Sequence, residues 1–590
     1  MKRLLPITFM VLVVVPILSW GKSNPIRPLL RSAFEKYDQG QFFEAVDLYQ
    51  KVLSIDSTHS EAHYYLADCF RYLFKYEEAL NHYQQVQASE ATKYPLLEFY
   101  LGATYKSLSN YQEAEKYFRA FTKADRGIEQ SAYWLLKANI ELQGIAKARE
   151  VPRMTTEDIQ ITRLPSPVNT TQHDFAATPY QNPHQLVVTS TRSESKGLIS
   201  HQQHGGAFSD NFIFLLDSNQ WRNRTSLHNF ETLNTTTDEG PGSISSDGNT
   251  YYFCRFNKGY YQLYVSERSN GKWDTPQLLP EPINLPQYTV KHPAISASGD
   301  TLFFSSDRPG GYGEHDLWMS VRQQNEWQAP INLGSLVNTP FQETSPYWNS
   351  EQKALFFASN GHPGWGGYDL FLVSHPLSVV SSPVVNLGKP LNSSYDDTYF
   401  WTNDRTGYLT SNRGGSSTGF DIYEYQLSAD KKSLLLAFSS QSQWANLANR
   451  LIQLSESSGE ENQPQFFQVL SSEEQKSLRQ AATRRIFETL QEEGAPILAE
   501  IEEAQQLATL YGENLQWLVK SQRMFLQNFQ VITWPDEVYQ WYSTLPSEEK
   551  EKVKRVARVL LRESLLNQYD ASVEVDNFQY DLLPSEQQQW

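Results

Sequence analysis

The segment SSDRPGGYGEHDLW (305–318) follows the apolar run Leu302-Phe303-Phe304 and ends in an aspartate and two large apolar residues. The same device returns as FFASNGHPGWGGYDLF (356–371) and as YLTSNRGGSSTGFDIY (408–423). In each copy a short apolar strand runs into a glycine-rich loop, and an aspartate begins the next strand. Three copies at a regular interval indicate a repeat, and this repeat decides the fold of the middle of the chain.

The strand-opening aspartates recur at steps of 53 and 52 residues: Asp316, Asp369 and Asp421. A similar step backward reaches Gln262 in a shortened copy, and one more reaches Asp210 after a long insertion. Each unit has room for four short strands of alternating hydrophobicity, separated by glycine-containing turns. Residues 155–430 are therefore predicted to form a five-bladed β-propeller.

A second motif lies between the units. An asparagine recurs there at an interval of 54 residues, at Asn284, Asn338 and Asn392, with a looser copy at Asn234. Another copy, 166–174, stands ahead of the first blade, and the segment 159–161 before it has the form of a blade's last strand. We predict that this early strand completes blade five. Such closure removes the exposed sheet edges that would otherwise aggregate.

The glycines and the aspartate of the loop have a common structural explanation. Tight loops need positive φ angles, which glycine adopts at little cost, so we expect them at Gly310, Gly311, Gly313, Gly364, Gly366 and Gly367. The loop amides then point inward, and the carboxylate of Asp316, Asp369 or Asp421 is expected to accept their hydrogen bonds. The alternative is a calcium site using Asp307 and Asp316. The other copies have Asn360 and Asn412 in place of Asp307, which favours the structural role.

The blades resemble the PD40 (TolB-like, WD40-like) propeller repeats of bacterial envelope proteins, whose pattern runs S-x-R-x-G-G-x-G-x-x-D followed by Leu or Ile and an aromatic residue. Blades three and five carry the best matches: Ser306, Arg308, Gly310, Gly311, Gly313, Asp316, Leu317 and Trp318, then Ser411, Arg413, Gly414, Gly415, Asp421, Ile422 and Tyr423. Blades one and two depart from the pattern.

Residues 28–148 have a helical period instead. The stretches 40–56, 74–90 and 109–125 align at offsets of 34 and 35 residues. Their shared small and aromatic positions, which we expect to pack the helices together, include Ala45, Tyr49, Ala79, Tyr83, Ala114 and Phe118. This pattern resembles the tetratricopeptide repeat (TPR), an α-solenoid. The resemblance implies a concave groove for peptides or partner proteins, with a spacer between domains as the alternative. Residues 129–146 are expected to form the solvated end helix of the stack.

The two ends of the chain differ from this core. Residues 1–21 have two early basic residues, an apolar run and small residues near Gly21, the form of a cleaved secretory signal peptide. An uncleaved anchor helix is the alternative, and a lipoprotein is not expected because the nearest cysteine is far away. Residues 438–590 are predicted to be a helical domain of unknown family, with helices over 470–490, 496–527 and 545–566.

The composition excludes several functions. A net charge of −17 disfavours nucleic acid and anionic membranes. Cys69 and Cys254 fall in different predicted domains and are interpreted as single buried thiols. Apart from GSSTG (415–419), which lies in the glycine-rich segment before Asp421, the chain contains no G-x-S-x-G match, and it has no H-E-x-x-H, Walker or dinucleotide motif. We therefore predict a protein that is not an enzyme and needs no cofactor. The histidines near 173–204 are interpreted as part of a polar insertion, with a transient metal site as the alternative.

In this order, signal peptide, TPR and PD40 propeller resemble the PorE type of periplasmic protein, which is associated with type IX secretion and gliding in Bacteroidota. The resemblance covers 28–430 and implies a periplasmic scaffold that docks other envelope proteins. PorE-type proteins continue into an OmpA-like domain, whereas helices are predicted here, so peptidoglycan binding is in doubt. The alternative function is a sensor whose propeller channel binds a glycan or a peptide.

Overall fold

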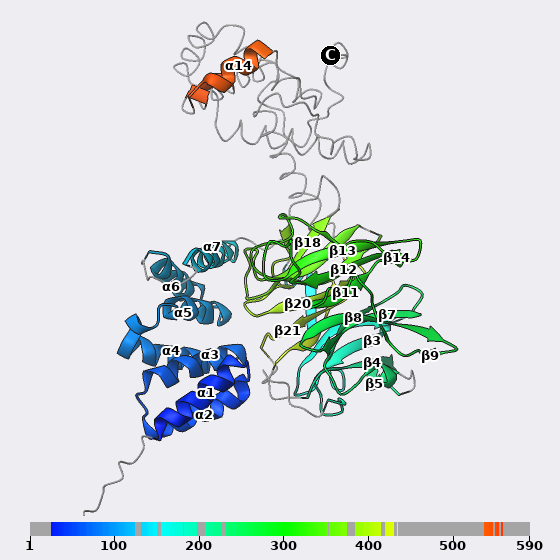
Figure 1. The fold of residues 1–590 in the computed structure, drawn as a ribbon, viewed down its shortest axis with the longest axis horizontal. Coiled ribbons are helices and arrows are strands. Elements are labelled where there is room, and N and C mark those ends of the chain that lie inside the picture. The colour runs from blue at the N-terminus through cyan, green and yellow to red at the C-terminus, as the bar shows by residue number, and fades with distance from the viewer. Residues whose placement is uncertain are drawn as a thin grey trace, which may run out of the picture. The chain divides into compact units, whose positions relative to one another are not determined.

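The computed structural model describes residues 25–123, 131–149 and 155–429, except for residues 181, 198–206, 227–229, 352, 375–383 and 415–418, together with residue 434 and parts of 536–557. The predicted signal peptide, Gly415 and most of the predicted C-terminal helical domain lie outside the described residues. The described chain divides into two compact units, one ending at Leu97 and the other beginning at Glu98. Figure 1 shows helices followed along the chain by sheets.

The N-terminal segment is a series of helices: α1 (Ile26–Asp38), α2 (Phe42–Ile55), α3 (Ser60–Tyr72), α4 (Tyr76–Glu90), the 3₁₀ turn η1 (Ala91–Lys93), α5 (Leu97–Ser107), α6 (Tyr111–Lys123) and α7 (Ser131–Lys147). In the first unit α1 packs on α2 and α3 on α4, while in the second unit α6 packs on α7. These TPR-like helical pairs confirm the predicted fold class of this segment.

The repeated small and aromatic positions lie between the paired helices. The six residues expected to pack there are at most 1 % exposed: Ala45, Tyr49, Ala79, Tyr83, Ala114 and Phe118. Gly102 of α5 shows why small residues recur. A methyl group at its Cα would lie 3.0 Å from the ring of Phe118 on α6. The close approach of the two helices therefore depends on the missing side chain.

Blades one and two of the propeller are antiparallel sheets. Blade one consists of β2 (Asp174–Tyr180), β3 (Asn182–Ser190), β4 (Asp210–Asp217) and β5 (Gln220–Asn223), followed by the 3₁₀ turn η2 (Phe230–Leu233). Blade two consists of β6 (Glu239–Ile244), β7 (Thr250–Asn257), β8 (Tyr260–Ser269) and β10 (Gln277–Leu278), with the short β9 (Lys272–Trp273) also paired to β8.

Blades three to five repeat the same order of strands. Blade three consists of β11 (Val290–Ile295), β12 (Thr301–Ser306) and β13 (Asp316–Gln323), with β14 (Glu326–Trp327) and β15 (Ile331–Asn332) both paired to β13. Blade four consists of β16 (Glu343–Asn349), β17 (Ala354–Ser359), β18 (Asp369–Ser374) and β19 (Val385–Asn386). Blade five consists of β20 (Asp397–Thr402), β21 (Thr406–Ser411), β22 (Asp421–Leu427) and β1 (Ile159–Arg163).

The ring closes through its outermost and innermost strands. Strand β1 pairs with β22, so that Ile159 lies opposite Leu427 and Arg163 opposite Tyr423. The inner strands β2, β6, β11, β16 and β20 contact one another in that order, and β20 contacts β2. The prediction that the segment near 160 completes blade five is confirmed. The last blade is thereby tied to the beginning of the propeller, which protects its edge.

Buried apolar side chains fill the space between neighbouring blades. Between blades four and five, Phe356 packs with Phe400 and Tyr425. Between blades five and one, Tyr408 packs with Phe212 and Phe214. The joint that closes the ring is thus a hydrophobic core like the others, and its burial stabilises the closed form.

An asparagine binds each inter-blade segment to a third strand. Asn338 Oδ1 accepts a hydrogen bond from the Leu317 amide (2.8 Å), and its Nδ2 donates to the Leu317 carbonyl (3.0 Å). Both buried backbone groups are thereby satisfied. The same two-way bond joins Asn169 to Ile422, Asn234 to Asn211, Asn284 to Leu263 and Asn392 to Leu370.

Three further observations concern the cysteines, the C-terminal region and the apolar character of the helices. Cys69 and Cys254 are free and buried, which confirms the interpretation of single thiols. Within the described part of the C-terminal region, Asp536–Thr544 forms α14, a stretch between two predicted helices. None of the helices in the described ranges combines the length and the apolar character that crossing a bilayer requires.

Candidate functional site

Each inner strand of the propeller is interrupted at the same point by a β-bulge. In β11 the pairing shifts between Lys291 and Ala294, and His292 has a φ of 54°. Equivalent shifts with positive φ occur at Ala176, Ser345 and Tyr399. Blade two has the same register shift, with Gly240 and Pro241 as the two residues between Glu239 and Gly242. Bulges re-aim side chains, and backbone in this uncommon region often marks a functional site.

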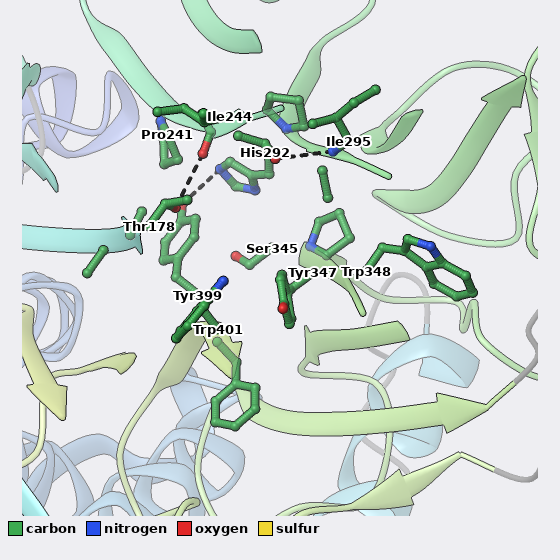
Figure 2. A pocket seen from close by; sticks show the side chains of 18 of the residues that line it. Thr178, Pro241, Ile244, His292, Ile295, Ser345, Tyr347, Trp348, Tyr399 and Trp401 are labelled. Atoms are coloured by element: carbon green, nitrogen blue, oxygen red, sulfur yellow. Dashed lines mark hydrogen bonds between the residues drawn. The ribbon is translucent and has the colours of Figure 1, made fainter. Parts of the chain in front are cut away.

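The bulges surround a pocket in the centre of the ring (Figure 2). Consecutive residues of each inner strand line it: 176–179, 241–244, 292–295, 345–348 and 399–401. The cavity has a volume of about 120 Å³. Typical pockets for drug-sized ligands begin at about 300 Å³, so this one fits a small group or the tip of a larger ligand. Its lining side chains are apolar, aromatic or hydroxyl-bearing, apart from the imidazole of His292.

A short hydrogen-bonded chain crosses one side of the pocket. His292 Nδ1 lies 2.5 Å from Thr344 Oγ1, and His292 Nε2 lies 2.8 Å from the Tyr399 hydroxyl. Figure 2 shows His292 and Tyr399 pointing toward each other. Burial lowers the pKa of His292 well below its ordinary value and raises that of Tyr399. Both side chains are therefore neutral at physiological pH, and the pocket presents dipoles rather than charge.

Aromatic residues of blades four and five also belong to the lining of the pocket. The ring centroids of Tyr347 and Trp401 lie 6.3 Å apart, and the Trp348 ring stacks on Phe303 at 5.1 Å. The Tyr347 hydroxyl donates to the carbonyl of Thr402 (2.9 Å), which holds its ring in place. Fixed aromatic faces beside hydroxyl groups bind flat or sugar-like ligands through stacking and a few directed hydrogen bonds.

The strand-opening aspartates lie in the blade loops rather than in this pocket. Asp316 accepts hydrogen bonds from the amides of Tyr312 (2.6 Å) and Gly313 (3.1 Å). Asp369 accepts one from the Gly366 amide (3.1 Å). Asp421 instead forms an ion pair with Arg163 at 2.7 Å. The first two carboxylates thus satisfy loop amides, and the third receives a cation from the closing strand.

The prediction of positive φ angles in these loops is wrong for most of the glycines. Of the six glycines of blades three and four, only Gly310 has a positive φ, of 90°. The others avoid steric overlap: a methyl group at Gly311 would meet Asp316, and one at Gly364 would meet Asp369. Gly313, Gly366 and Gly367 are likewise overlapped by the following inter-blade segment. Gly414 has open space around it. Steric clearance, and not a positive φ, therefore requires glycine at five positions: Gly311, Gly313, Gly364, Gly366 and Gly367.

A second layer of acids begins the inner strands. Asp174, Glu239 and Asp397 form buried ion pairs with Arg192, Arg255 and Arg413, respectively. Blade four differs, since Glu343 accepts hydrogen bonds from Ser359 (2.6 Å) and Thr339 (2.8 Å) and has no arginine partner among the described residues. Burial raises the pKa of Glu343 to about 7.

The pocket residues were not among those predicted from the sequence. One signal was available, because His292-Pro293 and Ser345-Pro346 are 53 residues apart, the period of the blades. A polar residue before proline at the same point of two repeats marks a shared backbone feature. The bulge itself could not be derived, because it depends on the pairing of two strands.

The solved structures that are similar to parts of this chain include two TolB proteins and a type III secretion chaperone. TolB from Acinetobacter baumannii is 12 % identical, with a TM-score of 0.27, over 44 % of this chain and 56 % of that one. A putative TolB from Agrobacterium tumefaciens is 14 % identical, with a TM-score of 0.27, over 43 % and 77 %. The type III secretion translocator chaperone SycD of Yersinia enterocolitica is 18 % identical, with a TM-score of 0.20, over 22 % and 97 %.

The chain thus spans about half the length of TolB from Acinetobacter, with 56 % of it covered. No family model matches the chain, and no curated protein is significantly similar to it. The assignment of helical pairs and blades rests on the helix contacts and hydrogen-bonded sheets described above.

Proposed function

We propose that this protein is an exported, non-enzymatic scaffold of the bacterial cell envelope that binds other proteins through its first helices. The observation that carries the proposal is a group of touching aromatic rings on α1, α2 and α3, which we name the aromatic cluster: Phe34, Tyr37, Phe42, Tyr65 and Tyr72.

The aromatic cluster is ordered yet partly open to solvent. Phe34 meets Tyr65 edge-on at 5.3 Å, and Phe42 stacks on Tyr72 at 4.2 Å. Phe34 is 41 % exposed and Tyr72 is 40 % exposed. Aromatic side chains held in place by one another lose little entropy on binding, and they are enriched at the centres of protein interfaces. The cluster is thus suited to a partner with apolar side chains.

The cellular setting of the proposal rests on the sequence. Residues 1–21 have the form of a cleaved signal, and the order of TPR and PD40 segments resembles periplasmic proteins associated with type IX secretion and gliding. Cell fractionation tests the first point: the mature chain should appear in the periplasmic fraction, shortened by about two kilodaltons, an estimate from the length of the signal. A protein of unchanged mass in the cytoplasm would contradict export.

Cross-linking in intact cells tests the binding surface. The double variant Phe34→Ser, Tyr65→Ser should lose cross-linked envelope proteins by about tenfold or more, since exposed aromatic anchors carry most of an interface's free energy. The matched control is Phe43→Ser, which is 53 % exposed but lies outside the aromatic cluster as defined. Equal loss from both variants, or from neither, would refute the proposal.

A second candidate function is favoured by the uncharged central pocket. There the propeller would bind a glycan or an apolar peptide side chain against Trp348 and Trp401, with hydrogen bonds from Tyr399. Tryptophan fluorescence should change on titration with a neutral oligosaccharide or peptide ligand, and Tyr399→Phe should weaken binding by about threefold to tenfold. Unchanged affinity in Tyr399→Phe together with Trp401→Ala would exclude the pocket.

A further inference from the structure

Helices α5, α6 and α7 lie within the same compact unit as the propeller, and their side chains bond to blade loops. Lys106 Nζ donates to the carbonyl of Gly366 (2.8 Å), and the Tyr111 hydroxyl donates to that of Trp365 (3.3 Å). Ser109 Oγ donates to Ser394 Oγ (2.8 Å). The contacts involve the glycine-rich loop of blade four and the segment leading to blade five. Residues about 260 positions apart in the chain are thus joined directly.

The centre of this contact is charged and buried. Lys106 pairs with Glu141 at 2.5 Å, and their side chains are only 5 % and 10 % exposed. Lys137 pairs with the same carboxylate at 3.5 Å, donates to the carbonyl of Asn360, and lies over the ring of Phe341 at 4.7 Å. Buried charges cost free energy unless they are paired and hydrogen-bonded. Here both lysines obtain backbone carbonyls from blade four as partners, so the arrangement requires the contact.

The shape of α7 supports the same conclusion. We expected this helix to be the solvated end of the helical stack, and that expectation is wrong for one of its faces. Gly144 approaches the carbonyl of Gly364 so closely that a methyl group in its place would overlap the loop backbone. Tyr133 at the other end bonds to Glu314 (2.6 Å) and packs on Phe341 at 4.9 Å between ring centroids. Gly144 of α7 and Gly364 of the blade-four loop together allow this close approach.

Among the described residues, the strand-opening aspartate of blade four has no arginine partner, unlike that of blade five. Asp421 of blade five is paired with Arg163 of the closing strand, whereas Asp369 receives the Gly366 amide. Burial raises the pKa of Asp369 to about 8, and the positive charge of Lys106 acts on it in the opposite direction. The cationic charge that acts on Asp369 therefore belongs to α5.

We infer that α5–α7 are a structural part of the propeller, which complete blade four by supplying Lys106 and Lys137, and are not a third partner-binding repeat. The first two helical pairs then carry the helical binding surface alone, while the loop face of blade four is already occupied. This inference does not depend on the proposed scaffold function.

Hydrogen exchange of the full chain tests the electrostatic part. Lys106→Met should raise amide exchange in 360–369 by about tenfold or more, because the Gly366 carbonyl and the Glu141 carboxylate lose the ammonium group that they share. The matched control is Lys116→Met on α6, which removes an exposed ion pair with Glu113, 66 % and 34 % exposed. If Lys106→Met disturbs only the helices and leaves 360–369 protected as in the parent protein, the inference is overturned.

Gly144→Ala tests the steric part in a way that separates docking from helix stability. Alanine favours an isolated helix over glycine, so a free α7 should become more protected from exchange. A docked α7 should instead become less protected, together with 360–369, because the new methyl group meets Gly364. Gln143→Ala, on the exposed side of the same helix, is the control. Increased protection of α7 in Gly144→Ala without any effect on blade four would contradict the inference.

Discussion

Blades four and five have equivalent strands, and each has a glycine-rich segment in its sequence, yet their buried acids have different partners. Blade five uses its own arginines, with Arg413 on Asp397 and Arg163 on Asp421. In blade four, the described donors to Glu343 are hydroxyl and amide groups. Burial raises the pKa of Asp369 to about 8, and the cation that opposes this shift is Lys106 of helix α5. The two blades therefore share their strand geometry but not their charged residues. The charged residues differ in blade four, where α5–α7 pack against the blade.

The two blades also differ in the donor to the backbone carbonyl that precedes the inter-blade asparagine, which belongs to Leu391 or Val337. In blade five Arg413 donates to the carbonyls of Pro390 (3.1 Å) and Leu391 (2.6 Å). In blade four Gly361 occupies the arginine position, and the neighbouring His362 bonds to the carbonyl of Val337 (2.9 Å). One neutral imidazole replaces a guanidinium that made several bonds, so blade four should depend less on this residue.

The largest expected difference follows from removing these two side chains. Arg413→Met leaves the fully buried Asp397 without a cation, which should lower the free energy of unfolding by about 3–5 kcal/mol. His362→Leu loses one hydrogen bond and should cost about 1 kcal/mol. Denaturant unfolding followed by tryptophan fluorescence measures both. Similar losses of stability from the two variants would show that blade four depends on His362 as much as blade five depends on Arg413.

The pH dependence of stability should distinguish the two inner-strand acids. The pKa of Glu343 is raised from 4.5 to about 7 by burial, so the folded state holds a proton that the unfolded state has released. Stability from this group is full below about pH 4.5 and falls as the pH rises to about 7. Relative to Glu343→Gln, the parent protein should lose about 2–3 kcal/mol across that window. Asp397→Asn is the control variant, since this acid is held in an ion pair with Arg413 instead of by hydroxyl groups.

A flat difference between the parent protein and Glu343→Gln from pH 5 to pH 7 would show that Glu343 has an ordinary environment. The measurement needs only unfolding curves at several pH values, and the comparison between two variants cancels the contribution of the other titrating groups.

The inter-blade asparagines should behave alike in both blades. Asn392 bonds both backbone groups of Leu370 in blade four, and Asn169 those of Ile422 in blade five. Replacing either with alanine leaves two buried backbone groups without these partners, which should cost about 2 kcal/mol each. A much larger effect at Asn169 would indicate that ring closure relies on its asparagine more than the internal boundaries do.

Much of the fold was predictable because the repeats can be compared with one another within a single sequence. Steps of about 53 residues between Asp316, Asp369 and Asp421 predict equivalent blades, and an extra strand-like segment near 160 predicts closure. The glycines were recognised for the wrong reason, since Gly364 is needed for steric clearance and not for its φ. Sequence pattern reveals that a side chain is small but not what approaches it.

The chain by itself determined the number of blades, the closing strand and the packing positions of the helices, because these follow from local periodicity and burial. Only the tertiary structure decided the bulged ring around the pocket and the seat of α7 on blade four. Both depend on residues distant in the chain, where register between strands and the pairing of buried charges are set by packing in three dimensions. Lys106, Glu141 and Gly366 have no common sequence pattern, and only the folded chain brings them together.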